Sequence, residues 1–255
     1  MPRGWLIKAA ALCCSLALLF AASAAGEGAL VIVNDIVLRA DGGFQPRALP
    51  RQKFAPIDFR GHFDIAAKGG GKPVVLESAV VDFDRDGRLS VGGLPVCPVE
   101  RVAQASTAQA RQVCAGAIVG TGDIGASIDL PDGSVSGNAP LTLFNGPRQG
   151  GNPTVILHAH TNFPATETFA IVVPIERRPG PFRYRATLVL PPIAGGDGAI
   201  THVGVRVGRR FSVGGQPRSY IAARCSDGIL RTHGRFSFAD GTVVDGSVEK
   251  PCRAR

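Results

Sequence analysis

Short runs of apolar or alternating residues, separated by turn dipeptides, extend along most of the chain. Asp-Gly and Asn-Gly pairs, which tolerate the positive φ angles of tight hairpins, recur from Asp41-Gly42 to Asp245-Gly246. The runs between them are Leu30–Leu38, Val74–Phe83, Thr154–Thr161, Phe169–Ile175, Thr187–Leu190, Ile200–Val207 and Gly234–Phe238. Successive side chains of a strand point to opposite faces, so this pattern predicts an all-β fold built as an antiparallel β-sandwich.

One segment predicts a helix. Ser106 and Gln109 have the spacing of a capping box, in which each side chain bonds to the backbone N–H of the other residue. We therefore expect one short helix near residues 107–114. If the chain turns just before this helix, Cys114 returns toward Cys97, which one straight helix from Pro98 onward would not allow.

Several short segments of the first half recur in the same order in the second half. The pairs are Pro56–Arg60 with Pro174–Arg178, Arg88–Pro95 with Arg210–Pro217, Cys114 with Cys225, and Asp132–Val135 with Asp245–Val248. Four ordered matches predict two duplicated β-sandwich units, residues 26–165 and residues 166–255, which either stay separate or pack as one body.

Residues 1–25 have the features of a secretory signal peptide. Arg3 and Lys8 precede the uncharged apolar run Ala9–Phe20, and Ala22–Ala25 supplies small residues for cleavage. The run is shorter than the roughly 20 apolar residues that a membrane anchor needs. We expect cleavage after Ala24 or Ala25, rather than retention as an anchor, and a secreted or cell-surface protein.

Four cysteines remain after such cleavage: Cys97, Cys114, Cys225 and Cys252. An even number in an exported chain predicts two disulfides, and the count alone allows three pairings. If each disulfide closes a loop inside one predicted unit, the pairs are Cys97–Cys114 and Cys225–Cys252.

The chain carries 28 Lys and Arg against 20 Asp and Glu, a formal net charge of +8. The basic residues are spread along the chain and are not interleaved with aromatic residues, which argues against a nucleic-acid partner. A basic excess of this kind still favours weak attraction to an anionic cell-envelope surface.

Asp82, Asp84 and Asp86, followed by Gly87, match the first half of a calcium-binding loop. Gly93 stands where that loop needs a bidentate Glu. We therefore expect weak calcium binding at most, with a dissociation constant of roughly 10⁻⁴–10⁻³ M. The alternative is a hairpin in which Asp86 and Gly87 make the turn and Asp82 and Asp84 face solvent.

His158 and His160 are two residues apart in a predicted strand, so both imidazoles share one face and could bind one metal ion. A third ligand would have to come from His62, His202, His233 or Glu167. The alternative is two half-exposed residues on an outer face, with Val155 and Leu157 pointing inward.

Other catalytic patterns are weaker. Gly120, Gly122 and Gly125 have the spacing of a dinucleotide-binding loop, but Ala126–Pro131 alternates like a strand where that motif needs a helix. The sequence contains no Gly-x-Ser-x-Gly motif.

Four segments of the sequence are distinctive: Gly92–Cys97, Cys114–Gly120, Phe144-Asn145-Gly146 and the C-terminal Asp-Gly…Cys pattern. In these segments the chain resembles uncharacterised exported all-β proteins of high-GC bacteria. This resemblance implies no activity and no site. Our hypothesis is an exported, non-catalytic binding or structural protein. The alternative is an extracytoplasmic metal-dependent hydrolase that uses His158 and His160.

Overall fold

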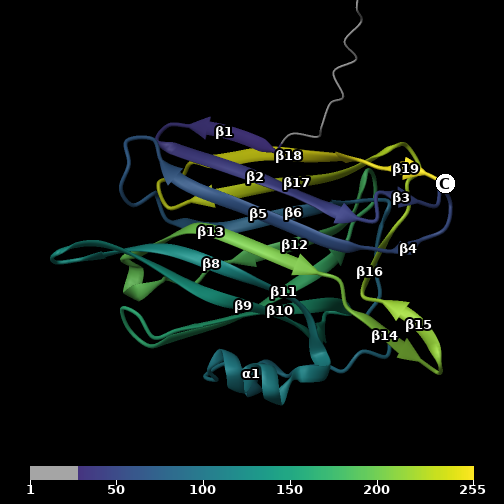
Figure 1. Cartoon of the computed structure of the whole chain (residues 1–255). Helices are drawn as coiled ribbons and strands as arrows, with labels where there is room; N and C mark the ends of the chain where they lie inside the picture. The colour runs from purple at the N-terminus through teal and green to yellow at the C-terminus, as the bar shows by residue number, and fades with distance from the viewer. Residues whose placement is uncertain (1–27) are drawn as a thin grey trace, which may run out of the picture.

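The computed structural model describes residues 28–255, so the predicted signal peptide lies outside the described residues. Most of these residues form antiparallel strands, which confirms the all-β prediction (Figure 1). The main sheet has twelve strands in the order β1 (Ala29–Val33), β2 (Ile36–Gln45), β5 (Asp58–Ala67), β13 (Gly198–Val207), β8 (Ile118–Leu130), β9 (Gly133–Gln149), β10 (Asn152–Thr161), β11 (Glu167–Arg177), β12 (Phe182–Val189), β6 (Leu76–Asp84), β17 (Ile229–Phe238) and β18 (Val243–Pro251).

Short elements complete the chain. The small sheets contain β3 (Ala48–Leu49), β4 (Ala55–Pro56), β7 (Gly87–Leu89), β14 (Arg210–Val213), β15 (Gln216–Ser219), β16 (Ile221–Ala223) and β19 (Arg253–Ala254). The helical elements are α1 (Thr107–Val113) and the 3-10 turns Val99–Arg101, Ala115–Ala117 and Ala194–Gly196. None of these helical elements combines the length and the apolar character that crossing a bilayer requires.

The main sheet curls until its two outermost strands lie beside each other. A Cβ built on Gly246 of β18 would lie 3.4 Å from Cγ2 of Val31 in β1, and Figure 1 shows these strands along the same edge of the molecule. Because of this curl, one face of the main sheet points inward and is enclosed by the sheet itself. One buried cluster on that face includes Leu38, Ile65 and Phe236.

The two predicted units share this one sheet. β13 comes from the second half of the chain but lies between β5 and β8, and β6 comes from the first half but lies between β12 and β17. The division at residue 165 therefore separates neither two sheets nor two cores.

The matched segments also lie in different settings, so the internal repeat is not confirmed. Pro56 belongs to β4 of a small sheet, whereas Pro174 belongs to β11 of the main sheet. Val91 lies outside the strands, whereas Val213 ends β14. The Gly-Gly pairs of these segments recur because tight turns need the same residue type, whatever strands they join.

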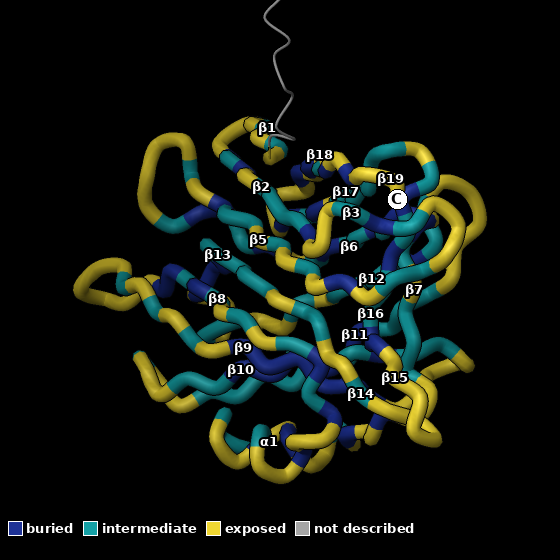
Figure 2. The backbone as a smooth tube through the Cα atoms, turned by 45° about the vertical axis from the view of Figure 1, so that its right-hand side comes forward, coloured by how far each residue is buried: buried dark blue, intermediate teal, exposed yellow. Residues whose placement is uncertain are grey.

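The predicted helix is present and begins with the predicted capping box. The Ser106 hydroxyl accepts a hydrogen bond from the Gln109 backbone N–H, and the Gln109 side chain accepts one from the Ser106 backbone N–H. The helix returns the chain so that the Cα atoms of Cys97 and Cys114 are 5.5 Å apart in a disulfide. This stapled segment covers the outer face of β9 and β10, where Figure 2 shows many buried residues.

The second disulfide joins Cys225 and Cys252, whose Cα atoms are 5.9 Å apart. It lies in a buried cluster with Phe44, Leu49 and Ile57, at the end of the molecule where the C-terminus lies. Both predicted pairings are confirmed.

Gly120, Gly122 and Gly125, which have the spacing of a dinucleotide-binding loop, lie in β8. A Cβ on Gly122 would collide with the carbonyl oxygen of Gly204, and one on Gly120 with that of Arg206, both in the neighbouring β13. The glycine spacing therefore allows close backbone approach between two strands, which agrees with the sequence-based rejection of a dinucleotide site.

Candidate ligand-binding cavity

The inner face of the curled sheet borders an apolar cavity of about 360 Å³. Its walls come from strands that are far apart in the sequence, chiefly β8 to β13. Representative lining side chains are Ile124, Leu141, Leu157, Phe169, Ile171 and Leu188. Several of them, including Leu157 and Phe169, are only half-buried although they face inward, because they border open space instead of other side chains.

β11 and β12 separate along one wall of the cavity. The cross-strand pairs of these two strands comprise only residues 175–177 of β11 and residues 184–186 of β12. Beyond that point β11 continues beside β10, while β12 continues beside β6. Phe169 and Ile171 lie on one side of the gap, and Leu188 and Leu190 lie on the other.

Two loops form the rim of the cavity. Phe163, Ala165 and Thr166 follow β10, Pro191 and Gly195 follow β12, and all five are exposed lining residues. Phe163 is 56% exposed.

A hydrogen bond links the two rim segments. The Glu167 carboxylate, at the start of β11, accepts it from the Ala194 backbone N–H at 3.3 Å. This contact holds the two loops together at one side of the rim.

A second apolar cavity of about 280 Å³ continues the interior toward the other end of the strands. Phe63 and Val203 line both cavities, so the two spaces are neighbours. Asp84, Arg231 and Lys250 line the second cavity in addition to its apolar residues.

The three predicted calcium ligands do not form a common site. Arg185 donates two hydrogen bonds to Asp82, at 2.8 and 2.7 Å. The Asp84 carboxylate accepts hydrogen bonds from the backbone N–H groups of Asp86 and Arg231, at 2.8 and 2.9 Å.

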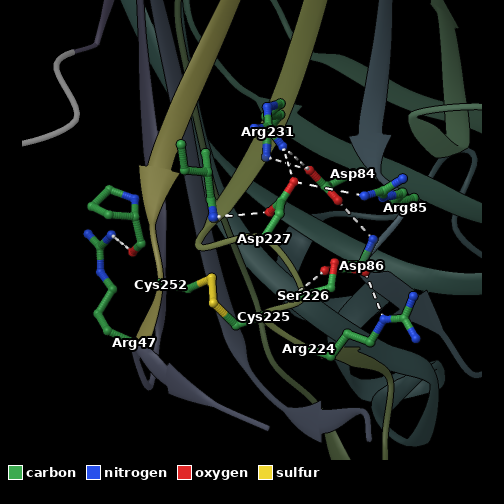
Figure 3. Close-up of a disulfide and its surroundings, with 12 residues drawn as sticks. Arg47, Asp84, Arg85, Asp86, Arg224, Cys225, Ser226, Asp227, Arg231 and Cys252 are labelled. Carbon is green, nitrogen blue, oxygen red and sulfur yellow. Dashed lines mark hydrogen bonds and ion pairs between the residues drawn. A yellow bond between two sulfur atoms is a disulfide. The ribbon is translucent and has the colours of Figure 1, made fainter. Parts of the chain in front are cut away.

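Asp86 is also occupied, by the backbone N–H of Ser226 at 2.8 Å and by Arg224 Nε at 2.7 Å (Figure 3). Asp82 and Asp84 are buried, so the alternative in which these two carboxylates face solvent is wrong. Among the described residues, no group of three or more His, Cys, Asp or Glu side chains is arranged to hold a metal ion.

Two of these carboxyls have opposite pKa shifts. Hydrogen bonds from Arg185 hold the pKa of Asp82 below its ordinary value. Burial raises the pKa of Asp84, because removal from water disfavours the ionised form more than its two backbone hydrogen bonds favour it. This acidic network fixes the start of β17 to the end of β6.

His158 and His160 share one face of β10, as predicted, but they have different surroundings. His158 is fully buried beneath the stapled helical segment, where Nε2 lies 3.0 Å from the Ala105 carbonyl oxygen. Burial lowers the pKa of His158. The expectation of two half-exposed histidines is therefore wrong for His158, because the helix covers this part of the sheet.

His160 contacts neighbouring polar groups instead of His158. Its Nδ1 lies 2.7 Å from the Thr168 hydroxyl oxygen, and its Nε2 lies 3.2 Å from Asn162 Oδ1. None of the candidate third ligands joins the two imidazoles in a metal-binding group of the described residues. Val155 and Leu157 do face the interior, as the alternation predicted.

One candidate third ligand belongs to a different cluster. His202 lies between two carboxylates, with Nδ1 2.7 Å from Asp64 and Nε2 2.9 Å from Asp123. These residues come from three adjacent strands, β13, β5 and β8, so sequence spacing gave no sign of the cluster. Because each ring nitrogen faces a different acid, the cluster joins strands and does not direct several ligands at one point.

The comparisons with known proteins add no family to this geometry. No family model, no curated protein and no solved structure matches the chain.

Proposed function

We propose that this chain is an exported, non-catalytic binding protein that holds an apolar small molecule in the cavity behind the β11–β12 gap. The observation that carries the proposal is the cavity itself, about 360 Å³ with an almost continuous apolar lining. Ligand pockets of proteins have volumes of roughly 300–1,000 Å³ and mostly apolar walls.

The physical argument rests on the tight packing of ordinary protein interiors. Voids larger than one water molecule are few in a native core, and each costs stability because its lining loses dispersion contacts. Water gains little in a space that offers few hydrogen-bond partners, and apolar cavities of about 150 Å³ are known to stay dry and to bind small apolar molecules. An apolar occupant would restore the missing contacts.

The chemistry of the lining defines the ligand class. No charged side chain projects from the inner strands of the first cavity, and Glu167, its one acidic lining residue, lies at the rim. A ligand with an apolar body and a neutral polar group left at the rim fits this distribution. The neighbouring second cavity gives room for a longer apolar chain past Phe63 and Val203.

Two features support the exported and non-catalytic parts of the proposal. Disulfides persist mainly in oxidising compartments outside the cytosol, and this chain has two. The histidines that suggested a hydrolase have other partners, Ala105 for His158 and Thr168 and Asn162 for His160.

The test is the binding of a neutral fluorescent probe, N-phenyl-1-naphthylamine, followed by its displacement with long-chain alcohols. We expect one saturable site per chain. Ala139→Phe places a ring into the cavity and should weaken probe binding at least tenfold, since Ala139 is a half-buried lining residue. Ala66→Phe, the same change at an exposed position of β5 outside the lining, should leave binding unchanged.

The proposal fails if the probe does not saturate, or if both variants bind it as the parent does. Mass spectrometry of an organic extract of the purified protein gives an independent check. A compound retained by the parent and lost in Ala139→Phe would identify the natural ligand.

A further inference from the structure

Three arginine side chains gather over one aromatic ring at the opposite end of the strands from the cavity rim. Phe54 lies in the loop before β4, and its ring is half-buried. The guanidinium carbons of Arg88, Arg183 and Arg224 lie 5.6, 5.3 and 5.2 Å from its centroid. The ring attracts each cation through its quadrupole, and this attraction allows three like charges to approach one another.

The three arginines differ in how far their charge is compensated. Arg224 donates a hydrogen bond from Nε to the buried Asp86, and Figure 3 shows its two terminal nitrogens pointing away from that carboxylate. Arg88 and Arg183 take part in none of the ion pairs found among residues 28–255.

Further positive charge lies close by in the sequence. Arg51 and Lys53 belong to the same loop as Phe54, and both are exposed. Of the basic residues in this loop and around its ring, Arg224 alone forms an ion pair among residues 28–255, with Asp86. The chain as a whole carries only a modest basic excess, so such a local excess is a distinct feature of this surface.

We propose that Phe54, Arg88, Arg183 and Arg224 form a binding site for a phosphate group. The guanidinium groups of Arg88 and Arg183 supply two uncompensated charges, which match the charge of about −1.5 to −2 on a phosphate monoester near pH 7. Arginine presents its donors in a planar fork that suits phosphate oxygens. Arg224, held in place by Asp86, adds donors whose position is already fixed.

The site is independent of the apolar cavity, because none of its four residues lines that cavity. A free phosphate and the phosphate headgroup of a lipid share the same chemistry. The experiment therefore contains one arm for each source.

The first arm is calorimetric titration of the purified protein with inorganic pyrophosphate at low ionic strength. The second arm is cosedimentation with vesicles of phosphatidylglycerol, with phosphatidylcholine vesicles for comparison. We expect the double variant Arg88→Gln/Arg183→Gln to lower affinity at least tenfold in whichever arm binds. Arg101→Gln/Arg209→Gln removes the same charge elsewhere and should change affinity less than twofold.

Phe54→Leu provides a second variant, which keeps every charge and removes the aromatic ring. It should lower affinity severalfold, because the arginines lose the surface that gathers them. Binding only in the pyrophosphate arm assigns a free phosphate ligand, and binding to anionic vesicles with competition by pyrophosphate assigns a headgroup. Equal losses in the two double variants, or no binding in either arm, would overturn the proposal.

Discussion

The two ends of the curled sheet differ in how they are held together. At one end, Asp84 and Asp86 hold the chain around Cys225–Cys252 through charged and backbone hydrogen bonds (Figure 3). At the other end, β11 and β12 separate, and apolar side chains border a cavity instead of one another. Phe182 of β12 pairs with Asp84 at the first end, and Leu188 of β12 pairs with Ala79 near the second end. At about 3.3 Å per residue along β12, the two ends lie roughly 20 Å apart.

The difference shows how one sheet can combine a fixed frame with a space for binding. Buried charges must be matched by partners in a defined geometry, so the network end tolerates little change. Apolar contacts are less directional, so the cavity end can admit a ligand without breaking hydrogen bonds. We expect substitutions to affect stability at the network end and binding at the cavity end.

The largest effect is expected from Asp86→Ala. The carboxylate is 1% exposed and accepts hydrogen bonds from Arg224 and Ser226, so its removal leaves two donors without their acceptor. Breaking a buried pair on one side should cost about 3 kcal/mol of unfolding free energy, measured by urea denaturation. Asp123→Ala is the control. Its side chain is 64% exposed, and its loss should cost less than about 1 kcal/mol.

Equal losses in the two Asp variants would show that the network end is no more demanding than the exposed surface. The contrast between the two ends would then disappear.

A smaller effect is expected from Phe169→Ala at the cavity end. Truncating a fully packed Phe typically costs about 3–5 kcal/mol, but Phe169 is half-buried beside open space. The loss should be about 1–2 kcal/mol, and the neutral probe should still bind. Val189→Ala, at a position 67% exposed, is the control and should stay within about 0.5 kcal/mol. A loss of 3 kcal/mol or more in Phe169→Ala would argue that this region is tightly packed.

Acid should weaken the network end, and Asp82→Asn tests this. Because its folded-state pKa lies below the ordinary 3.8, ionised Asp82 stabilises the fold fully above about pH 4 and loses that effect as the pH falls through the lowered pKa. Asp84, with a raised pKa, acts in the opposite sense.

The measurement is urea denaturation of the parent and the variant between pH 7 and pH 3. Asp82→Asn should be less stable at pH 7 and should lose less stability toward pH 3 than the parent does. Asp132→Asn, in an exposed hairpin turn, should follow the parent. Parallel curves for parent and Asp82→Asn would contradict the assignment.

Features that depend on neighbouring residues could be predicted from the sequence. The capping box of Ser106 and Gln109 follows from a short spacing and is present. The pairing of Cys97 with Cys114 is present too, although its prediction assumed two units, and the internal repeat is not confirmed. The sequence pattern did not predict the hairpin between β1 and β2, because its turn at Asn34-Asp35 contains no glycine. In this turn Asn34 adopts the positive φ of 54° that glycine usually provides.

Features that depend on distant residues could not be predicted. Asp82 and Asp86 gave a calcium motif because their partners, Arg185 and Arg224, lie more than 100 residues away in the sequence. The cavity has no local signal either, since its walls come from separate strands and only the curl of the sheet brings them together. An apolar residue that faces a cavity has the same sequence pattern as one that faces a core.

The smallest effect on stability is expected from Phe163→Ser at the rim. The side chain is 56% exposed, so its loss should change the unfolding free energy by less than about 0.5 kcal/mol. Because Phe163 lies over the opening and not deep among the walls, its removal should speed both association and dissociation of the neutral probe, by about threefold each, and leave the dissociation constant nearly unchanged. Stopped-flow fluorescence measures both rates. Leu130→Ser, at an exposed hairpin position outside the lining, should leave both rates unaltered. A change in the dissociation constant without a change in association rate would place Phe163 in the binding surface, and unchanged rates would place the opening elsewhere on the molecule.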